Sequence, residues 1–173
     1  VKGAGGAAAA QFQVAEQAAL SRLDDAKLAP ARRTDLLVEL SRTLMQHATV
    51  ASPANQAELW EQAVRVVQEG AYAQPAPVHR ELLLAQAAIV LAERATYARR
   101  EAETTPWDST TLKDARQACE RALTAVRSLI AQSSGETGRR TVNELTPVEL
   151  RAYQQTLQLI EGTVFRDRAR LGT

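Results

Sequence analysis

The chain is poor in the residue types that build disulfides, metal sites and nucleophilic active sites. Its 173 residues contain one cysteine and two histidines, so Cys119 cannot form an internal disulfide. Neither His47 nor His79 has a second ligand at metal-binding spacing, and we expect both at exposed helix ends. The sequence also lacks a Gly-x-Ser-x-Gly elbow and a phosphate-binding loop. These absences predict no catalytic residue, no cofactor and no metal, and therefore a protein that is not an enzyme.

The chain also lacks an excess of one charge and a long apolar run. It has 21 basic and 20 acidic residues, a net charge of +1, which gives no general attraction to nucleic acid or anionic lipid. The longest apolar run, Leu82 to Ala92, is well short of the roughly 20 residues that span a bilayer. Aromatic residues, which stack on bases, make up only 4% of the chain. We therefore expect neither a membrane span nor a nucleic-acid partner.

What the chain has in abundance is small and aliphatic apolar residues at helical spacing. Apolar residues account for 45% of the sequence, mostly as alanine, leucine and valine, which suit packing between helices. Their period predicts an all-α fold of about six antiparallel helices. The expected helices cover about 11–26, 30–48, 53–70, 78–105, 109–130 and 147–164.

Several local signals predict where these helices begin and end and which parts of them are buried. Thr146 and Glu149 form a capping box with proline between them at the first helical position. Gly70 is expected to end the third helix in a left-handed cap. The fourth helix turns from apolar to charged after Glu93, and we expect this charged part to project past the core. Cys119 falls on the inner stripe of the fifth helix, where cysteine acts as a small hydrophobe.

The domain organisation follows from glycine, alanine and polar content. Residues 1–10 are rich in glycine and alanine and predict a flexible tail or linker, and residues 11–173 predict a single all-helical domain. A polar stretch predicts a mobile loop near 133–145. The chain begins with valine, which suggests a processed product or a fragment. The high alanine and low lysine content suggests a bacterial source, and leaves cytoplasm and periplasm equally open.

Two segments of the chain echo each other, one from Leu59 to Val67 and one from Ala118 to Val126. In both, an alanine precedes an aliphatic residue: Ala63-Val64 with Trp60 nearby, and Ala122-Leu123 with Ala115 and Cys119 nearby. This pattern resembles the second helices of tetratricopeptide (TPR) repeats, which implies a right-handed stack of helical hairpins. The segments begin further apart than the roughly 34 residues of that repeat, which leaves an up-down helical bundle as the alternative.

We therefore expect a non-enzymatic helical scaffold that mediates protein–protein interaction within a larger assembly. In the TPR-like arrangement, the first helix of each pair lines the concave face, and helical phase places Arg42, Gln46, Gln86 and Arg94 there as contacts to a protein or peptide. The alternative function is a structural module that forms a homo-oligomer through the stripes of the fifth and sixth predicted helices.

Overall fold

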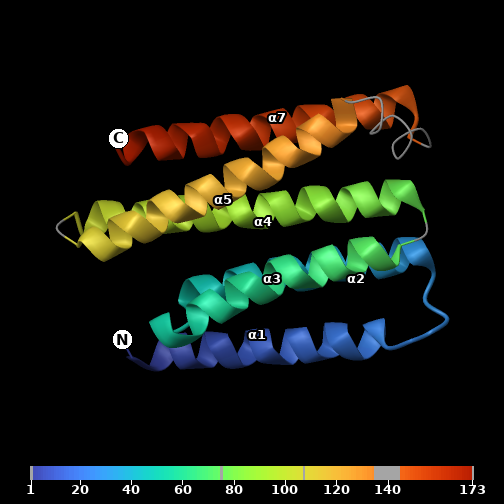
Figure 1. The fold of residues 1–173 in the computed structure, drawn as a ribbon. Helices are drawn as coiled ribbons and strands as arrows, with labels where there is room; N and C mark the ends of the chain where they lie inside the picture. Colours follow the sequence, from blue (N-terminus) through green and yellow to red (C-terminus); the bar gives the residue numbers. More distant parts are fainter. Residues whose placement is uncertain (1, 75, 107, 135–144, 173) are drawn as a thin grey trace. The chain divides into compact units, whose positions relative to one another are not determined.

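The computed structural model describes residues 2–74, 76–106, 108–134 and 145–172. In these ranges the chain forms six α-helices and no strand (Figure 1), which confirms the all-α class. The helices are α1 (Lys2–Leu23), α2 (Pro30–Val50), α3 (Pro53–Ala73), α4 (Pro77–Thr104), α5 (Ser109–Ser134) and α7 (Pro147–Arg170). None of the helices described carries an apolar stretch long enough to cross a membrane.

The chain forms two compact units, residues 1–90 and 91–173. The single domain expected over 11–173 stays a prediction. The boundary falls inside α4, whose first half is apolar and whose second half is charged. Each half packs within its own unit, because the apolar half meets aliphatic side chains and the charged half meets an ion-pairing partner. A change of side-chain character along one helix therefore marks the division.

The first unit contains α1, α2, α3 and the start of α4. The helix α2 packs against both α1 and α3, and its four leucines at helical spacing are all buried: Leu36, Leu37, Leu40 and Leu44. A core cluster joins α2 (Leu37), α3 (Val67 and Ala71) and α4 (Leu83 and Ala87). The leucine stripe of α2 is thus buried within this unit.

The predicted role of Gly70 is wrong. The helix α3 continues past it to Ala73, and the one glycine with a positive φ in the described ranges is Gly172, at 69°. A Cβ built on Gly70 would lie 2.5 Å from Cδ1 of Leu37. The glycine therefore lets α3 approach α2 closely, which is a packing requirement that a terminal cap signal cannot distinguish.

Residues 2–10 form the first turns of α1, where the sequence predicted a tail or linker. Residues 7–10 are all alanine, which has the highest helix propensity of any residue type, and this offsets the cost of the neighbouring glycines. The mobile loop predicted near 133–145 falls mainly at 135–144, outside the described residues.

The second unit contains the end of α4 together with α5 and α7, which pack against each other. Their buried apolar residues lie at helical spacing: Ala115, Cys119, Ala122, Leu123 and Val126 on α5, and Tyr153, Leu157, Ile160 and Val164 on α7. The predicted capping box is confirmed, because the Thr146 amide donates to Glu149 Oε2 at 2.8 Å and the Glu149 amide donates to Thr146 Oγ1 at 3.3 Å.

Candidate interaction groove

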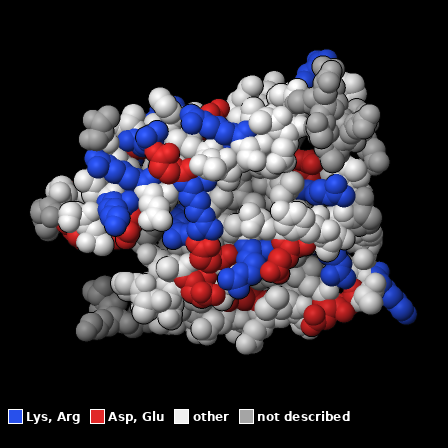
Figure 2. Space-filling model, viewed as in Figure 1, with Lys and Arg blue, Asp and Glu red and all other residues white. Residues whose placement is uncertain are grey.

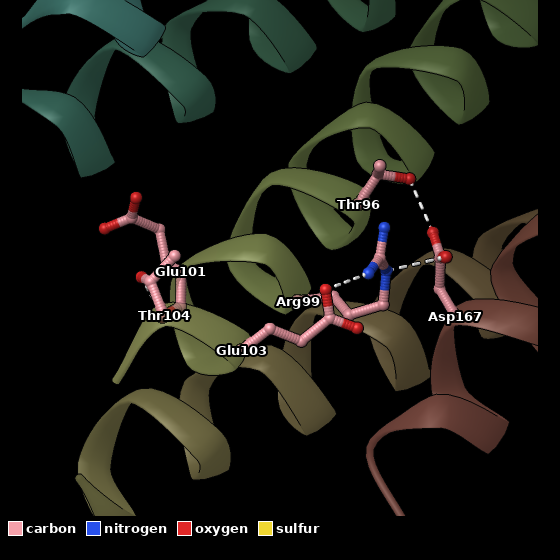
Figure 3. A network of polar contacts seen from close by, with 6 residues as sticks. All are labelled: Thr96, Arg99, Glu101, Glu103, Thr104 and Asp167. Carbon is pink, nitrogen blue, oxygen red and sulfur yellow. Dashed lines mark hydrogen bonds and ion pairs between the residues drawn. The ribbon is translucent and has the colours of Figure 1, made fainter. Parts of the chain in front are cut away.

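A buried ionic network joins α4 to α7 in the second unit (Figure 3). Arg99 and Asp167 are each only 6% exposed, and Arg99 Nε lies 2.8 Å from Asp167 Oδ1. Thr96 Oγ1 donates to the other oxygen of Asp167 at 2.6 Å, and Arg99 Nη1 donates to Glu103 at 2.5 Å. The charged end of α4 was predicted to project past the core. That prediction is wrong, because Asp167 supplies a buried partner that a single-helix pattern does not reveal.

The network keeps Arg99 charged inside the unit. Its pKa is raised above its ordinary value, mainly by the hydrogen bond to Glu103 and further by the charge of Asp167, against the opposing effect of burial. Removing two charges from water costs several kcal/mol per ion, so such a pair is stable only when each partner stays in place. The pair therefore fixes the position of α7 against α4.

Cys119 lies on the buried face of α5 and is fully shielded from solvent. Burial raises the pKa of its thiol to about 11, and the nearby carboxylates of Asp167 and Glu120 add to this. The thiol is therefore protonated at neutral pH and a poor nucleophile. The predicted burial of Cys119 as a packing residue is confirmed.

A groove of ≈ 490 Å³ lies between α5 and the end of α7. It is lined by Arg116, Glu120, Phe165, Arg168, Ala169 and Gly172. Arg168 Nη2 pairs with Glu120 Oε1 at 2.7 Å, which bridges the two helices. Arg116 Nη2 donates to the backbone carbonyls of Leu171 at 3.0 Å and Gly172 at 3.3 Å, so it caps the end of α7.

Phe165 faces this groove because of its phase on α7. Val164 and Asp167 are buried, and each α-helical residue is turned about 100° from the next. Phe165 is consequently turned away from the core and is 53% exposed, an unusual position for a phenylalanine. Arg168 lies one turn further on, at the same groove.

Basic side chains gather at this end of the second unit (Figure 2). The first half of α5 and the last turns of α7 carry six basic residues and three acidic ones: Lys113, Arg116, Arg121, Arg166, Arg168 and Arg170, against Asp114, Glu120 and Asp167. Asp167 is buried against Arg99 and does not face solvent. The local excess of positive charge is hidden in a net charge of +1 for the whole chain.

A second groove, of ≈ 500 Å³, lies in the first unit between α1, the end of α2 and the start of α3. His47 lines it and is not exposed as predicted: its side chain is 8% exposed, its Nδ1 lies 2.8 Å from Glu16 Oε1, and its ring stacks on Phe12 at 5.7 Å between centroids. The prediction failed because α1 covers the end of α2. Phe12 and Glu16, one turn apart, are the signal that could have revealed this contact.

The four partner residues predicted from helical phase divide between the two units, with Arg42, Gln46 and Gln86 in the first and Arg94 in the second. Arg42 and Gln46 are exposed one turn apart on α2, in the first unit. Gln86 is only 4% exposed, so it cannot contact a partner at the surface, because the helix around it is apolar on nearly every side. Arg94 is half-buried and belongs to the second unit. The α5/α7 groove was not predicted from the sequence. The residue that could have revealed it is Phe165, an aromatic residue that does not lie on the buried face of α7.

In the part of the chain that the structure describes, no three potential metal-ligating side chains come together. Comparison of the chain with protein-family models, with curated proteins and with solved structures found no match.

Proposed function

We propose that this chain is a non-enzymatic helical scaffold that binds a protein partner through the α5/α7 groove. The observation that carries the proposal is the exposed ring of Phe165 beside Arg116 and Arg168 in a concave surface. Aromatic and arginine side chains dominate the binding energy of protein interfaces, and a groove of this size can take one or two side chains of a partner.

One of the two expected helix pairs supports a TPR-like stack as the architecture of this scaffold, because α2 packs against α3. The alanines of the two echoing segments, Ala63 and Ala122, are both buried. In that stack α5 would pair with α4, whereas its extensive packing is against α7. An up-down bundle accommodates the same contacts, and the groove-based proposal holds for either arrangement.

Site-specific photo-crosslinking tests the proposed function. A photoreactive phenylalanine analogue replaces Phe165 in cells that make the protein, and the matched control places it at Tyr72, a strongly exposed residue of the first unit. We expect a discrete adduct with another protein from position 165 and none from position 72. Adducts of equal yield from both positions, or none from position 165, would refute the proposal.

Self-association is a second candidate function. The stripes of α5 and α7 that were expected to pair with a copy are buried within the second unit and are not available for this. However, Val148 and Leu159 lie on the outer face of α7, and Leu159 is 70% exposed. Light scattering after size exclusion tests this: a dimer that becomes monomeric in Leu159→Lys supports self-association, and a monomer at every concentration excludes it.

A further inference from the structure

We infer that the segment bound in the α5/α7 groove is acidic and carries an aromatic or branched aliphatic side chain that packs on Phe165. This inference rests on the proposed function and adds the chemistry of the partner. It follows from the charge, the apolar floor and the spacing of carboxylates in the groove.

The positive charge in the groove is only partly neutralised. Arg168 shares its charge with Glu120, whereas Arg116 contacts backbone carbonyls, which carry no net charge. Lys113 lies one turn before Arg116 on the exposed side of α5 and forms no ion pair within the described ranges. An incoming carboxylate would therefore meet two cations that lack a carboxylate partner, which favours an acidic segment.

The apolar part of the groove suits a single large side chain. Phe165 is followed one turn later by Ala169, and then by Gly172, so small residues leave open space beside the ring. A Cβ built on Gly172 would have no heavy atom nearer than Arg116 Nη2, at 3.9 Å. An aromatic or branched aliphatic side chain can fill this space and cover the exposed ring of Phe165.

The arrangement favours a protein segment over a nucleic acid, although both are acidic. Glu120 lines the groove, and an ion pair of Arg127 Nε with Glu161 Oε1, at 2.7 Å, continues along the same helices. A phosphate backbone carries a charge at every nucleotide and would meet these carboxylates, whereas a peptide can place its acidic residues between them. Phe165 is also the one aromatic side chain among the lining residues described, which offers little base stacking.

Fluorescence anisotropy with the whole chain tests the inference. The probes are labelled peptides of roughly twelve residues, rich in Glu and Asp, with two Phe or Leu residues three or four positions apart. Control peptides replace the acidic residues by Lys in one series and by Gln in the other. We expect binding of an acidic peptide that weakens as salt is raised, and no binding of the Lys series, because the attraction is electrostatic.

Three variants locate the site. Phe165→Ala should weaken binding about tenfold, the usual effect of truncating an interface anchor, and Lys113→Glu should weaken it by a factor of roughly three to ten. The matched control is Arg42→Glu, the same charge change on exposed α2, which should leave affinity unchanged. All three residues are exposed, so circular dichroism should show the same helix content in each variant.

The outcomes separate this inference from the proposed function. If the Gln and acidic peptides bind equally well and Phe165→Ala weakens both, the groove is a docking site but the acidic partner is overturned. The acidic partner is also overturned if Lys113→Glu binds the acidic peptide no more weakly than Arg42→Glu does. Tighter binding of single-stranded DNA than of any acidic peptide, lost in Lys113→Glu, assigns the groove to nucleic acid and overturns it. Failure of every peptide overturns it as well, while a crosslink at position 165 would still uphold the scaffold function.

Discussion

Replacing Asp167 with alanine should strongly destabilise the second unit, because it leaves a buried guanidinium without its buried carboxylate partner. Arg99 is 6% exposed, its Nε lies 2.8 Å from Asp167 Oδ1, and the hydroxyl of Thr96 donates a hydrogen bond to Asp167 Oδ2. Removing one partner of a buried pair typically costs 3–5 kcal/mol, and the lost hydrogen bond of Thr96 adds about 1 kcal/mol. Glu103 retains a contact with Arg99 from a half-exposed position, which reduces the total. We expect a net loss of about 3 kcal/mol.

The loss should be measured so that the second unit is seen separately. Because the chain has two compact units, a single urea transition followed by circular dichroism can mix their unfolding. Hydrogen exchange followed by mass spectrometry reports the opening free energy of peptides from the end of α4 and from α7 directly. The loss in Asp167→Ala should appear in these peptides and be small in peptides from α1 and α2.

Two control variants test whether the loss of stability comes from breaking the buried ion pair. Glu161→Ala breaks an ion pair between α5 and α7 in which Arg127 is 56% and Glu161 is 31% exposed, and it should cost less than about 1 kcal/mol. A double variant, Arg99→Met with Asp167→Leu, removes both charges and should recover most of the stability. If Asp167→Ala costs no more than Glu161→Ala, the network does not hold the unit together and the reasoning fails.

Four further predictions follow from other contacts. Cys119, whose thiol pKa is raised to about 11 by burial, should not react with a disulfide reagent at pH 8 until the protein unfolds. Thr146→Ala should cost about 1 kcal/mol by removing the cap of α7. Hydrogen bonds from Thr146 hold the pKa of Glu149 below its ordinary value of 4.5. The contribution of Glu149 to the stability of α7 is therefore present above pH 4.5 and is lost as the pH falls through the pKa of the folded state. An acid titration that follows helix content measures this loss. His47→Ala removes the contact with Glu16 and should increase hydrogen exchange in α1, whereas unchanged protection there would contradict the role of this contact.

The sequence was sufficient to predict features that depend on one helix at a time. The inner stripe of α5, with Ala115, Cys119 and Ala122, and the capping box of Thr146 and Glu149 are both confirmed. Each involves residues three or four positions apart, whose relation is set by helix geometry alone. Local periodicity and cap chemistry therefore predicted the class of the fold and most helix starts, but placed several C-terminal ends three to six residues away.

Features that depend on which helix lies next to which were not predicted. His47 has the sequence context of an exposed helix end, and only the packing of α1 across α2 buries it against Glu16. Arg99 lies in a charged stretch, and its burial depends on Asp167, in a helix far along the chain. Gln86 shows the opposite error: helical phase alone made it a contact residue, although the apolar helix around it is buried.

The buried pair and the groove are linked through the rotation of α7. Asp167 must face α4 to meet Arg99, and Val164 must face the core one turn earlier, which together fix the angle of the helix about its axis. With that angle set, Phe165 and Arg168 necessarily face the groove, because each is turned about 100° from its buried neighbour. An apolar residue at 167 would bury as well but would accept small rotations, whereas an ion pair requires a defined geometry. We therefore expect the Arg99→Met/Asp167→Leu variant, although stable, to bind the acidic peptide less tightly than the unchanged chain. Equal affinity would show that the rotation of α7 is set by its apolar stripe alone.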